Sequence, residues 1–499
     1  MNILDKIVES KKLEVKALYE RYDLRVLKEG LASNQPFSSP SPLFYQGLAK
    51  AHLEGKPFFI TEFKRKSPSE AWINQHAVLP DQIRAYAQAG ASAISVLTDE
   101  PFFGGTFEDL KIARQTLDAG NWTIDPGLST PLLLQKDFVL DPIQVFLARH
   151  YGADIILLIA AILQADQLES LKRLAESIGL GVLVEVHDHE ELVKVQHLDI
   201  KALGVNNRDL KTFRTSLNRV NVLKKMAGPG FIVAESGVLD YRHFQMVRNA
   251  DGFLIGTGLM RDKEQGLPQS GLAEHFQSHG KFLFKACGIR TAEILQDLKA
   301  WNRQSPEPDY IGINFSPVSK RRVDGQTSEV FKTSEVCPSV AVAVFYKNSE
   351  SEILDILEKH PFRTVQLYAG DVSPEFVRSI KQRVILAVKI NGQIPWDQTF
   401  STLIEPYAAD VDCFILDAAN PGSGERIEAD IPAEFPYPFL IAGGLNEANL
   451  NVVLDYKNCI GVDIASGIET NGEVDLEKIG QIAKHLAALS LPHDLQNRL

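Results

Sequence analysis

The chain has 499 residues, of which 44% are hydrophobic and 23% charged. These values are typical of a globular protein and exclude a disordered or collagen-like chain. The formal net charge of −12 gives a surface that repels phosphate backbones, so we expect no nucleic-acid partner. The longest strongly apolar run, 155–163, is too short to cross a bilayer, and we expect no membrane association.

The cysteines and the N-terminal residues predict a cytoplasmic protein. Cys287, Cys337, Cys413 and Cys459 form no CxxC pair, as expected of reduced thiols. We interpret Cys337, Cys413 and Cys459 as core residues. The opening residues MNILDKIVESKK mix charged with apolar side chains and lack the apolar core of a secretion signal.

Short apolar runs recur in the first half of the chain, and most are separated by stretches with helical spacing. Such an alternation indicates a parallel sheet that is covered by helices on both faces. The runs lie at 57–63, 91–98, 131–138, 153–160, 181–186, 202–207, 231–237 and 252–258. Eight units of this kind in about 280 residues predict a (β/α)8 barrel.

The second half of the chain repeats the pattern. Its apolar runs lie at 284–289, 309–315, 339–346, 364–369, 384–390, 413–418, 439–444 and 461–466. No GxGxxG follows a strand, which argues against a doubly wound dinucleotide-binding sheet. We therefore predict an α/β protein of two tandem TIM barrels, 1–279 and 280–499, with one or two extra amphipathic helices in residues 1–30.

Charged side chains gather at the expected carboxyl ends of the first barrel's strands, where barrel enzymes carry their chemistry. Isolated charges are costly inside a barrel unless they pair with one another or with a ligand. A structural ring of ion pairs would explain one such pair, but two lysines and three glutamates from four strands favour an active site. The residues concerned are Glu62, Lys64, Lys136, Glu185, Asn206, Arg208, Glu235 and Ser236.

The last two strand ends of each barrel predict phosphate sites. Glycines there let backbone N–H groups approach an anion, although a tight turn alone would also need glycine. The residues are Gly237, Gly256 and Thr257 in the first barrel, and Gly443, Gly444, Ser466 and Gly467 in the second. Two such sites imply two phosphorylated ligands, or one ligand passed between the barrels.

The second barrel offers a thiol and a carboxyl group at its strand ends. Cys287 and Asp417 can serve as base and acid, while Cys287 equally fits a buried apolar position. Arg321 can hold a carboxylate or lie in a solvated basic loop. His187 and the other histidines complete no metal-ligand set, so we expect no metal and no cofactor.

Motifs at these strand ends resemble, in order, the bifunctional tryptophan-biosynthesis family in which indole-3-glycerol-phosphate synthase is fused to phosphoribosylanthranilate isomerase. The resemblance covers nearly the whole chain. The synthase-like segments are TEFKRKSPS (61–69), SVLTDEPFFGGTFEDL (95–110), QKDFVLDPIQ (135–144), LVEVHDHEE (183–191), LGVNNRDL (203–210), VAESGV (233–238) and GFLIGTGLM (252–260). The isomerase-like segments are KACGIRT (285–291), GINFSPVSKRRV (312–323), VQLYAGD (365–371), FILDAANPGSG (414–424), IAGGL (441–445) and GVDIASGIE (461–469).

The resemblance implies roles for the first barrel's residues. Lys136 is similar to the general acid that activates the substrate's ketone for ring closure, and Glu185 to its partner in the loss of water. Lys64 would bind the substrate and take part in proton transfer, while Glu62 orients the lysines. Phe103 would pack against the aromatic ring. The family's remaining binding positions correspond to Asn206, Arg208, Glu235 and Ser236. Ser67 lies in the segment that matches the family's loop on the phosphate side.

For the second barrel the resemblance implies that Cys287 is the general base, Asp417 the general acid and Arg321 a substrate-binding residue. The implied reactions isomerise N-(5-phosphoribosyl)anthranilate and then form indole-3-glycerol phosphate with loss of CO2 and water. The implied partners are these phosphorylated anthranilate derivatives, without metal or cofactor. We expect a monomer, because the fusion already supplies the second enzyme.

Four places depart from the family's pattern. Glu70 and Ala71 replace its Lys-Gly, Lys320 replaces a proline, Tyr368 replaces a histidine, and Pro421 begins the segment that replaces its Gly-Gly-[Ser/Thr]-Gly. Two alternatives therefore stay open. One is an active synthase beside a non-catalytic second barrel, and the other is a Schiff-base sugar-phosphate aldolase with Lys64 or Lys136 as nucleophile.

Overall fold

The computed structural model describes residues 3–33, 42–68, 72–122, 128–209, 212–261, 272, 282–291, 293–294, 297, 307–323, 340–390, 394–418 and 431–490. The chain divides into two compact units. The first comprises Met1–Thr215 and Leu223–Ser278, and the second comprises Ser216–Val222 and His279–Leu499. Within the described residues, no helix is long and apolar enough to cross a membrane.

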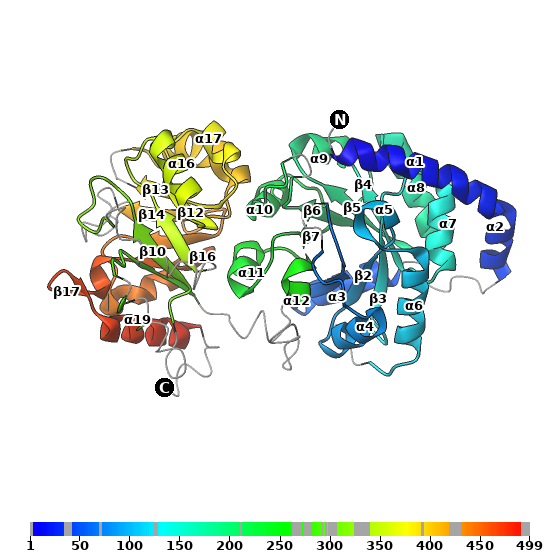
Figure 1. The fold of residues 1–499 in the computed structure, drawn as a ribbon, viewed down its shortest axis with the longest axis horizontal. Helices are drawn as coiled ribbons and strands as arrows, with labels where there is room; N and C mark the ends of the chain where they lie inside the picture. Colours follow the sequence, from blue (N-terminus) through cyan, green and yellow to red (C-terminus); the bar gives the residue numbers. More distant parts are fainter. Residues whose placement is uncertain are drawn as a thin grey trace. The chain divides into compact units, whose positions relative to one another are not determined.

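The first unit contains a closed barrel of parallel strands in the order β1 to β8, with β8 pairing back to β1 (Figure 1). Every one of these strands overlaps a predicted apolar run, so the predicted barrel is confirmed. The strands are β1 (Phe58–Phe63), β2 (Ala93–Leu97), β3 (Leu132–Lys136), β4 (Ile155–Ile159), β5 (Gly181–Val186), β6 (Ala202–Asn206), β7 (Phe231–Glu235) and β8 (Gly252–Ile255).

Helices surround this barrel, and several begin at a side-chain cap. Thr106 and Asp109 form a capping box at the start of α6, and Asp141 with Gln144 forms another at α7, which satisfies amide groups that a helix start leaves unpaired. The helices that follow β1 are α4 (Leu79–Gln88), α5 (Glu100–Phe103), α6 (Phe107–Asp118), α7 (Pro142–His150), α8 (Ala165–Ser177), α9 (His189–Val195), α10 (Arg219–Lys224), α11 (Tyr241–Val247) and α12 (Thr257–Arg261).

Three helices precede the first strand: α1 (Ile3–Arg21), α2 (Leu24–Ser33) and α3 (Leu43–Leu53). The first two confirm the predicted extra helices, whereas α3 was not predicted. Helix α3 reaches the amino-terminal ends of two strands. Its Phe44 ring lies 5.8 Å from Phe58 at the start of β1, and a side chain at Gly181, where β5 begins, would collide with Phe44. An apolar helix therefore packs against the end of the barrel opposite the expected site.

The second unit contains another closed parallel barrel, in which β16 pairs with β9 (Figure 1). Its strands are β9 (Leu283–Cys287), β10 (Tyr310–Asn314), β11 (Ala341–Val344), β12 (Thr364–Tyr368), β13 (Arg383–Ile390), β14 (Cys413–Ala418), β15 (Phe439–Ala442) and β16 (Cys459–Ile464). Each overlaps a predicted run, which confirms the second barrel as well.

The described covering elements of this barrel include short 3-10 and π turns beside α-helices. They are α16 (Glu350–Lys359), α17 (Pro374–Ser379), α18 (Trp396–Thr399), the π-helix η1 (Phe400–Ile404), the 3-10 helices η2 (Glu405–Asp410), η3 (Glu447–Asp455) and η4 (Ser466–Ile468), and α19 (Leu476–Leu489). A small hairpin, β17 (Glu469–Thr470) and β18 (Glu473–Val474), follows η4.

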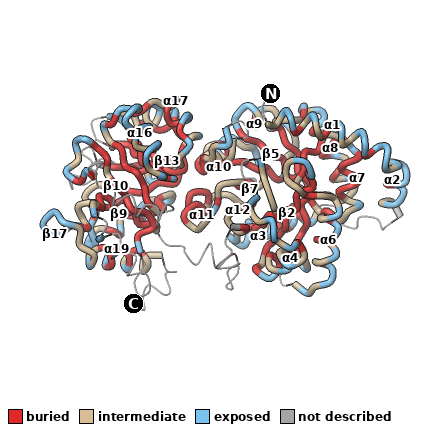
Figure 2. Tube along the Cα trace, in the orientation of Figure 1, coloured by how far each residue is buried: buried red, intermediate tan, exposed pale blue. Residues whose placement is uncertain are grey.

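Both sheets are buried along nearly their whole length, while exposed positions concentrate on the covering helices and loops (Figure 2). Most barrel-strand side chains are apolar, as expected for parallel strands covered on both faces. Exceptions are Gln135, Glu235 and Lys285, each fully or almost fully buried within a strand. Buried polar side chains require partners, and these partners define the two sites.

Candidate active sites

The site residues predicted for the first barrel surround one cavity at the carboxyl ends of its strands. Glu235 differs from the others, because it is fully buried rather than part of the cavity wall. The predicted residues that line the cavity are Glu62, Lys64, Ser67, Phe103, Lys136, Glu185, Asn206, Arg208, Ser236, Gly237, Gly256 and Thr257.

Lys136 lies at the centre of this group, at the last position of β3. Its Nζ donates to Glu235 Oε2 at 2.7 Å and to Glu185 Oε2 at 3.4 Å. The lysine therefore joins the ends of β3, β5 and β7. Glu185 also accepts a hydrogen bond from Asn206 Nδ2 at 3.2 Å, which brings in the end of β6.

The same contacts separate the proton affinities of the three groups. Burial opposes a charge on Lys136, but the carboxylates of Glu235, Glu185 and Glu62 raise its pKa above the ordinary value. Burial also opposes the charge on Glu185, yet Lys136, the adjacent His187 imidazole and a hydrogen bond from Asn206 hold the pKa of Glu185 well below its usual range. Burial raises the pKa of Glu235 to about 7 against the attraction of Lys136, with Glu185 adding to the rise. The site thus holds a charged ammonium group beside one ionised carboxylate and one that takes up a proton near neutral pH.

A second lysine–glutamate pair lies at the end of β1. Lys64 Nζ donates to Glu62 Oε1 at 2.6 Å, and Ser95 Oγ lies 3.5 Å from Glu62 Oε2. Glu62 is mostly buried at the cavity wall. Burial disfavours its charge, but Lys64 and Lys136 lower its pKa. A methyl group at Gly256 would lie only 2.7 Å from the Glu62 carboxylate, so glycine provides the space for this carboxylate.

His187 supports the Glu185 carboxylate from β5's end. Its Nε2 lies 3.2 Å from Glu185 Oε1 and its Nδ1 lies 3.1 Å from Glu191 Oε2. Burial opposes the imidazolium, but the two carboxylates raise the pKa of His187 to about 10. From the sequence, His187 was interpreted as a loop residue or a supporting residue behind the site, but its contact with Glu185 was not predicted. Its separation of two residues from Glu185, which puts both on one face of an extended segment, was the available signal.

Backbone geometry at one end of the cavity suits an anion. Ser236 and Gly237 both have positive φ, 64° and 87°, and for serine this conformation is uncommon. Thr257 begins helix α12 directly after Gly256. Together with Ser67, these residues line the cavity with small side chains and a turn that can present N–H groups.

The other part of the cavity wall is apolar. Phe103, at the end of α5, packs against Phe138 with ring centroids 6.0 Å apart. Ile3, Leu4 and Ile7 of helix α1 also line the cavity. The cavity therefore combines an aromatic wall, a charged centre and an anion-compatible turn.

In the second barrel, a cavity at the carboxyl ends of the strands is lined by Cys287, Lys320, Arg321, Tyr368, Asp417, Gly443, Gly444 and Ser466. Gly467 is not among the lining residues. A methyl group there would lie 2.0 Å from the carbonyl oxygen of Leu445, so Gly467 permits close packing of the backbone.

A buried ion pair lies next to the Cys287 thiol. Lys285 precedes Cys287 by two residues on β9, and its Nζ donates to Asp463 Oδ1 of β16 at 2.8 Å. The Lys285 ammonium and the Cys287 thiol both border Gly312, where a methyl group would lie 3.0 Å from Nζ and 2.8 Å from Sγ. Burial raises the pKa of Cys287 to about 11, and the Lys285 ammonium counteracts that rise. Both residues belong to one isomerase-like motif, but no role was predicted for Lys285.

Tyr368, which departs from the family's pattern, contacts the predicted acid. Its hydroxyl donates to Asp417 Oδ2 at 3.1 Å, and Gln366 Nε2 lies 3.4 Å from the tyrosine oxygen. The Tyr368 ring packs against Tyr346 at 4.7 Å. The replacement thus supplies Asp417 with a hydrogen-bond donor.

Arg321 makes a bidentate ion pair with Glu469. Its Nε and Nη2 donate to the two carboxylate oxygens at 2.5 and 2.8 Å. The guanidinium group is almost completely buried at the cavity wall. Glu469 was not singled out by sequence reasoning, although it ends one of the isomerase-like motifs.

Some predicted features lie outside the described residues, namely Glu70, Ala71, Cys337 and Pro421. Among the residues that the structure does describe, no three His, Cys, Asp or Glu side chains gather in a way that could hold a metal ion.

Comparisons with known proteins assign each barrel to a family. A family model described as indole-3-glycerol phosphate synthase matches residues 4–268, and one described as N-(5'phosphoribosyl)anthranilate (PRA) isomerase matches residues 284–485. The tryptophan biosynthesis protein TrpCF of Vibrio cholerae serotype O1 is 32% identical over 497 residues, which cover 97% of this chain and 96% of that protein. TrpCF of Buchnera aphidicola subsp. Diuraphis noxia is 30% identical over 492 residues, which cover 97% and 98%. Among solved structures, phosphoribosyl anthranilate isomerase from Thermus thermophilus is 25% identical with a TM-score of 0.34, covering 42% of this chain and 99% of its own.

The close approach of Glu235 to β6 can be tested through Gly204. A methyl group at Gly204 would lie 2.1 Å from Glu235 Oε1, and this carboxylate is fully buried and held by Lys136. We expect Gly204→Ala to lower the free energy of unfolding of the first unit by roughly 1–3 kcal/mol. Differential scanning calorimetry measures the change. Gly228→Ala is the matched control, because no atom lies within 4 Å of the position that its methyl group would take. If both variants melt like the parent chain, the carboxylate does not occupy this position.

Proposed function

Because this chain belongs to the family of bifunctional TrpCF tryptophan-biosynthesis proteins, we propose that the residues gathered in its two cavities carry out that family's two successive reactions. The second barrel isomerises N-(5-phosphoribosyl)anthranilate to 1-(2-carboxyphenylamino)-1-deoxyribulose 5-phosphate. The first barrel converts this product to indole-3-glycerol phosphate with loss of CO2 and water. The observation that carries the assignment of residues is the convergence of Lys136, Glu185 and Glu235 in the first cavity.

In the second barrel, Asp417 protonates the ring oxygen of the ribose and Cys287 removes the proton from C2. The first step breaks the bond between C1 and the ring oxygen, and the nitrogen lone pair forms an iminium group. Loss of the C2 proton then gives an enol that tautomerises to the ketone. One acid and one base suffice for this rearrangement. Tyr368 holds the Asp417 carboxyl group through its hydroxyl, in place of the family's histidine.

The thiol must lose its proton before it can act as a base. Burial alone makes this unfavourable, and Lys285 is the cation that stabilises the thiolate. The iminium charge of the ring-opened substrate adds a second positive charge at the moment when the C2 proton is removed. Arg321 binds the substrate's carboxylate only in competition with Glu469, which already holds the guanidinium group.

In the first barrel, the Lys136 ammonium donates its proton to the ketone oxygen while the anthranilate ring carbon attacks the carbonyl carbon. Loss of CO2 restores the aromatic ring, and Glu185 assists the departure of water. Lys64 binds the substrate and takes part in proton transfer, and Glu62 orients the two lysines. The raised pKa of Lys136 argues against Lys136 as the nucleophile of the aldolase alternative, because a Schiff base requires a neutral amine.

The cavity walls orient this substrate. Its phosphate lies at Ser67, Gly237, Gly256 and Thr257, and its aromatic ring lies against Phe103. The part of the substrate between the phosphate and the aromatic ring is bound by Asn206, Arg208 and Ser236. In the second barrel, the phosphate site is formed by Gly443, Gly444 and Ser466, and Gly467 allows the backbone beside them to pack closely. We further propose that the domains are 1–279 and 280–499, and that the protein is a cytoplasmic monomer without nucleic-acid or membrane partners.

Two variants separate the reactions in the purified chain without added metal. Lys136→Met removes the proton donor of ring closure. Phosphoribosylanthranilate should therefore be converted to the deoxyribulose compound, and this compound should accumulate. Asp417→Asn removes the isomerase acid, so no deoxyribulose compound should form. Anthranilate-ring fluorescence and the appearance of indole-3-glycerol phosphate report the two steps. We expect each rate to fall at least about 100-fold.

Mixing the two variants provides the control. Each supplies the step that the other lacks, so the mixture should again form indole-3-glycerol phosphate. Failure of the mixture, or a parent chain that stops at the deoxyribulose compound, would overturn the proposal for the first barrel. A parent chain that leaves phosphoribosylanthranilate unchanged would favour a non-catalytic second barrel.

The thiolate role of Lys285 is tested by alkylation of Cys287 with iodoacetamide. Only the thiolate reacts, so the rate in the parent chain should rise about tenfold per pH unit up to a pH of about 11. Lys285→Met removes the neighbouring cation, raises the pKa of the thiol further and should slow alkylation about tenfold or more at pH 8. Peptide mass spectrometry distinguishes Cys287 from Cys413, which is buried and serves as the internal reference.

Lys285→Met also leaves Asp463 without its ion-pair partner, so the double variant Lys285→Met/Asp463→Asn is the matched control. It removes both charges and should also react slowly. Alkylation of Cys287 at the parent rate in both variants would show that Lys285 does not stabilise the thiolate.

A further inference from the structure

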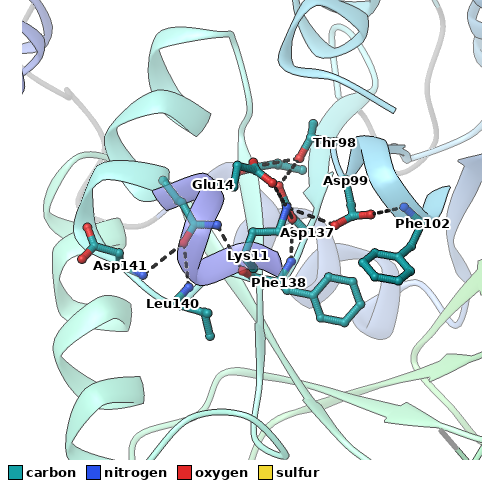
Figure 3. A network of polar contacts seen from close by, with 11 residues as sticks. Lys11, Glu14, Thr98, Asp99, Phe102, Asp137, Phe138, Leu140 and Asp141 are labelled. Atoms are coloured by element: carbon teal, nitrogen blue, oxygen red, sulfur yellow. Dashed lines mark hydrogen bonds and ion pairs between the residues drawn. The ribbon is translucent and has the colours of Figure 1, made fainter. Parts of the chain in front are cut away.

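A completely buried lysine on the N-terminal helix lies outside both groups of proposed catalytic residues. Lys11 Nζ lies 2.8 Å from Asp137 Oδ1, 3.2 Å from Asp99 Oδ2 and 2.8 Å from Glu14 Oε2 (Figure 3). Its side chain has no exposed surface. A buried ammonium group is costly without partners, and three carboxylates satisfy this one. Burial opposes its charge, but these carboxylates raise the pKa of Lys11 above the ordinary value.

The two aspartates belong to neighbouring strand ends. Asp99 follows β2 and caps helix α5 by accepting a hydrogen bond from the Phe102 amide at 2.9 Å. Asp137 follows β3 and accepts hydrogen bonds from the Phe138 amide at 2.7 Å and from Thr98 Oγ1 at 2.5 Å. Lys11 therefore connects helix α1 to two loops of the barrel (Figure 3).

Both loops carry residues of the proposed synthase site. Asp137 is the next residue after Lys136, the proposed acid. Helix α5, which Asp99 caps, ends at Phe103. The Phe103 ring contacts Phe138, so the two loops also meet through an aromatic pair. A shift of either loop would therefore move the aromatic wall relative to the acid.

Helix α1 also contributes directly to the cavity. Ile3, Leu4 and Ile7 line its wall, and Ile7 lies one helical turn before Lys11. The buried lysine thus fixes a helix whose preceding turns complete the cavity.

We propose that Lys11 is a positioning residue of the synthase reaction, which holds Phe103 and the backbone at Lys136 in place through Asp99 and Asp137. This inference rests on the roles proposed above for Lys136 and Phe103. Lys11 does not itself line the cavity, and it acts through the two aspartates, of which Asp137 belongs to the cavity wall.

The lysine has an electrostatic effect as well as a geometric one. Asp99 and Asp137 together carry two negative charges beside the aromatic part of the cavity, where the carboxylate of the anthranilate ring must enter. The single Lys11 ammonium offsets only part of this negative charge, but it does so at a fully buried position, where a charge acts strongly on its neighbours. Without it, the aspartates would repel the substrate's carboxylate.

Lys11→Met tests the inference in the full chain, since it keeps the long apolar stem and removes the charge. Steady-state kinetics are measured with 1-(2-carboxyphenylamino)-1-deoxyribulose 5-phosphate. We expect kcat/KM of the synthase to fall roughly 10- to 100-fold, with a rise in KM, because small displacements far from the reacting atoms have effects of this size. The isomerase activity of the same molecules should stay unchanged and serves as an internal reference.

Three further variants make the result specific. Lys12→Met changes the neighbouring exposed lysine, which pairs with Glu9 on the same helix at 2.8 Å, and should leave the kinetics unchanged. Lys11→Arg retains the charge and should recover much of the lost kcat/KM. Asp99→Asn keeps an acceptor for the helix cap but alters the charge balance, and it provides a milder variant if Lys11→Met does not fold.

If Lys11→Met lowers the melting temperature but leaves the synthase kcat and KM within twofold of the parent, the inference is wrong. Lys11 then has only a structural role, which is to stabilise the packing of helix α1. Equal defects in Lys11→Met and Lys11→Arg would also contradict it, since the charge would then be irrelevant. Failure of the proposed function itself is recognised separately, because Lys136→Met would then retain synthase activity.

Discussion

Both barrels depend on the pairing of charges that a closed parallel sheet removes from water. The interior of such a barrel is filled with side chains, so an ammonium or carboxylate group placed there needs a partner from another strand. In the first barrel Lys136 meets this need with Glu185 and Glu235, and in the second Lys285 meets it with Asp463. The pairs hold strand ends together, and the same pairs set the proton affinities that the chemistry uses.

The two sites use this constraint differently. In the first, one ammonium group lies between two carboxylates that cannot both be ionised at low cost, so their pKa values separate: that of Glu185 falls and that of Glu235 rises to about 7. In the second, the ion pair lies beside a thiol, whose pKa burial raises and the ammonium lowers. The proposed acid, Lys136, is therefore kept charged in the first barrel, and the thiolate form of the proposed base, Cys287, is stabilised in the second.

Much of this organisation could be predicted from the sequence, because parallel barrels leave a regular signal. Each strand is a continuous apolar run, and chemistry appears where the run ends, so Lys136, Glu185 and Cys287 stood out. What remained hidden depends on contacts between distant segments. Helix α3 has no charged motif to distinguish it, Glu469 pairs with Arg321 across 148 residues, and Lys11 pairs with Asp137 from the middle of the N-terminal helix. A lysine on an amphipathic helix normally lies in solvent, and only the folded structure reveals that this one is buried.

The departures from the family's pattern are informative for the same reason. Replacing a histidine by Tyr368 changes the side chain but retains a hydrogen-bond donor toward Asp417, so the carboxyl group keeps a polar partner in a buried place. The same requirement explains why Glu469 faces Arg321: a guanidinium group at the cavity wall needs a carboxylate, and the substrate supplies one only while it is bound. With the role proposed for Arg321, substrate binding in the second barrel is an exchange of one carboxylate for another. Its free energy reflects the difference between the two ion pairs, not the full strength of either.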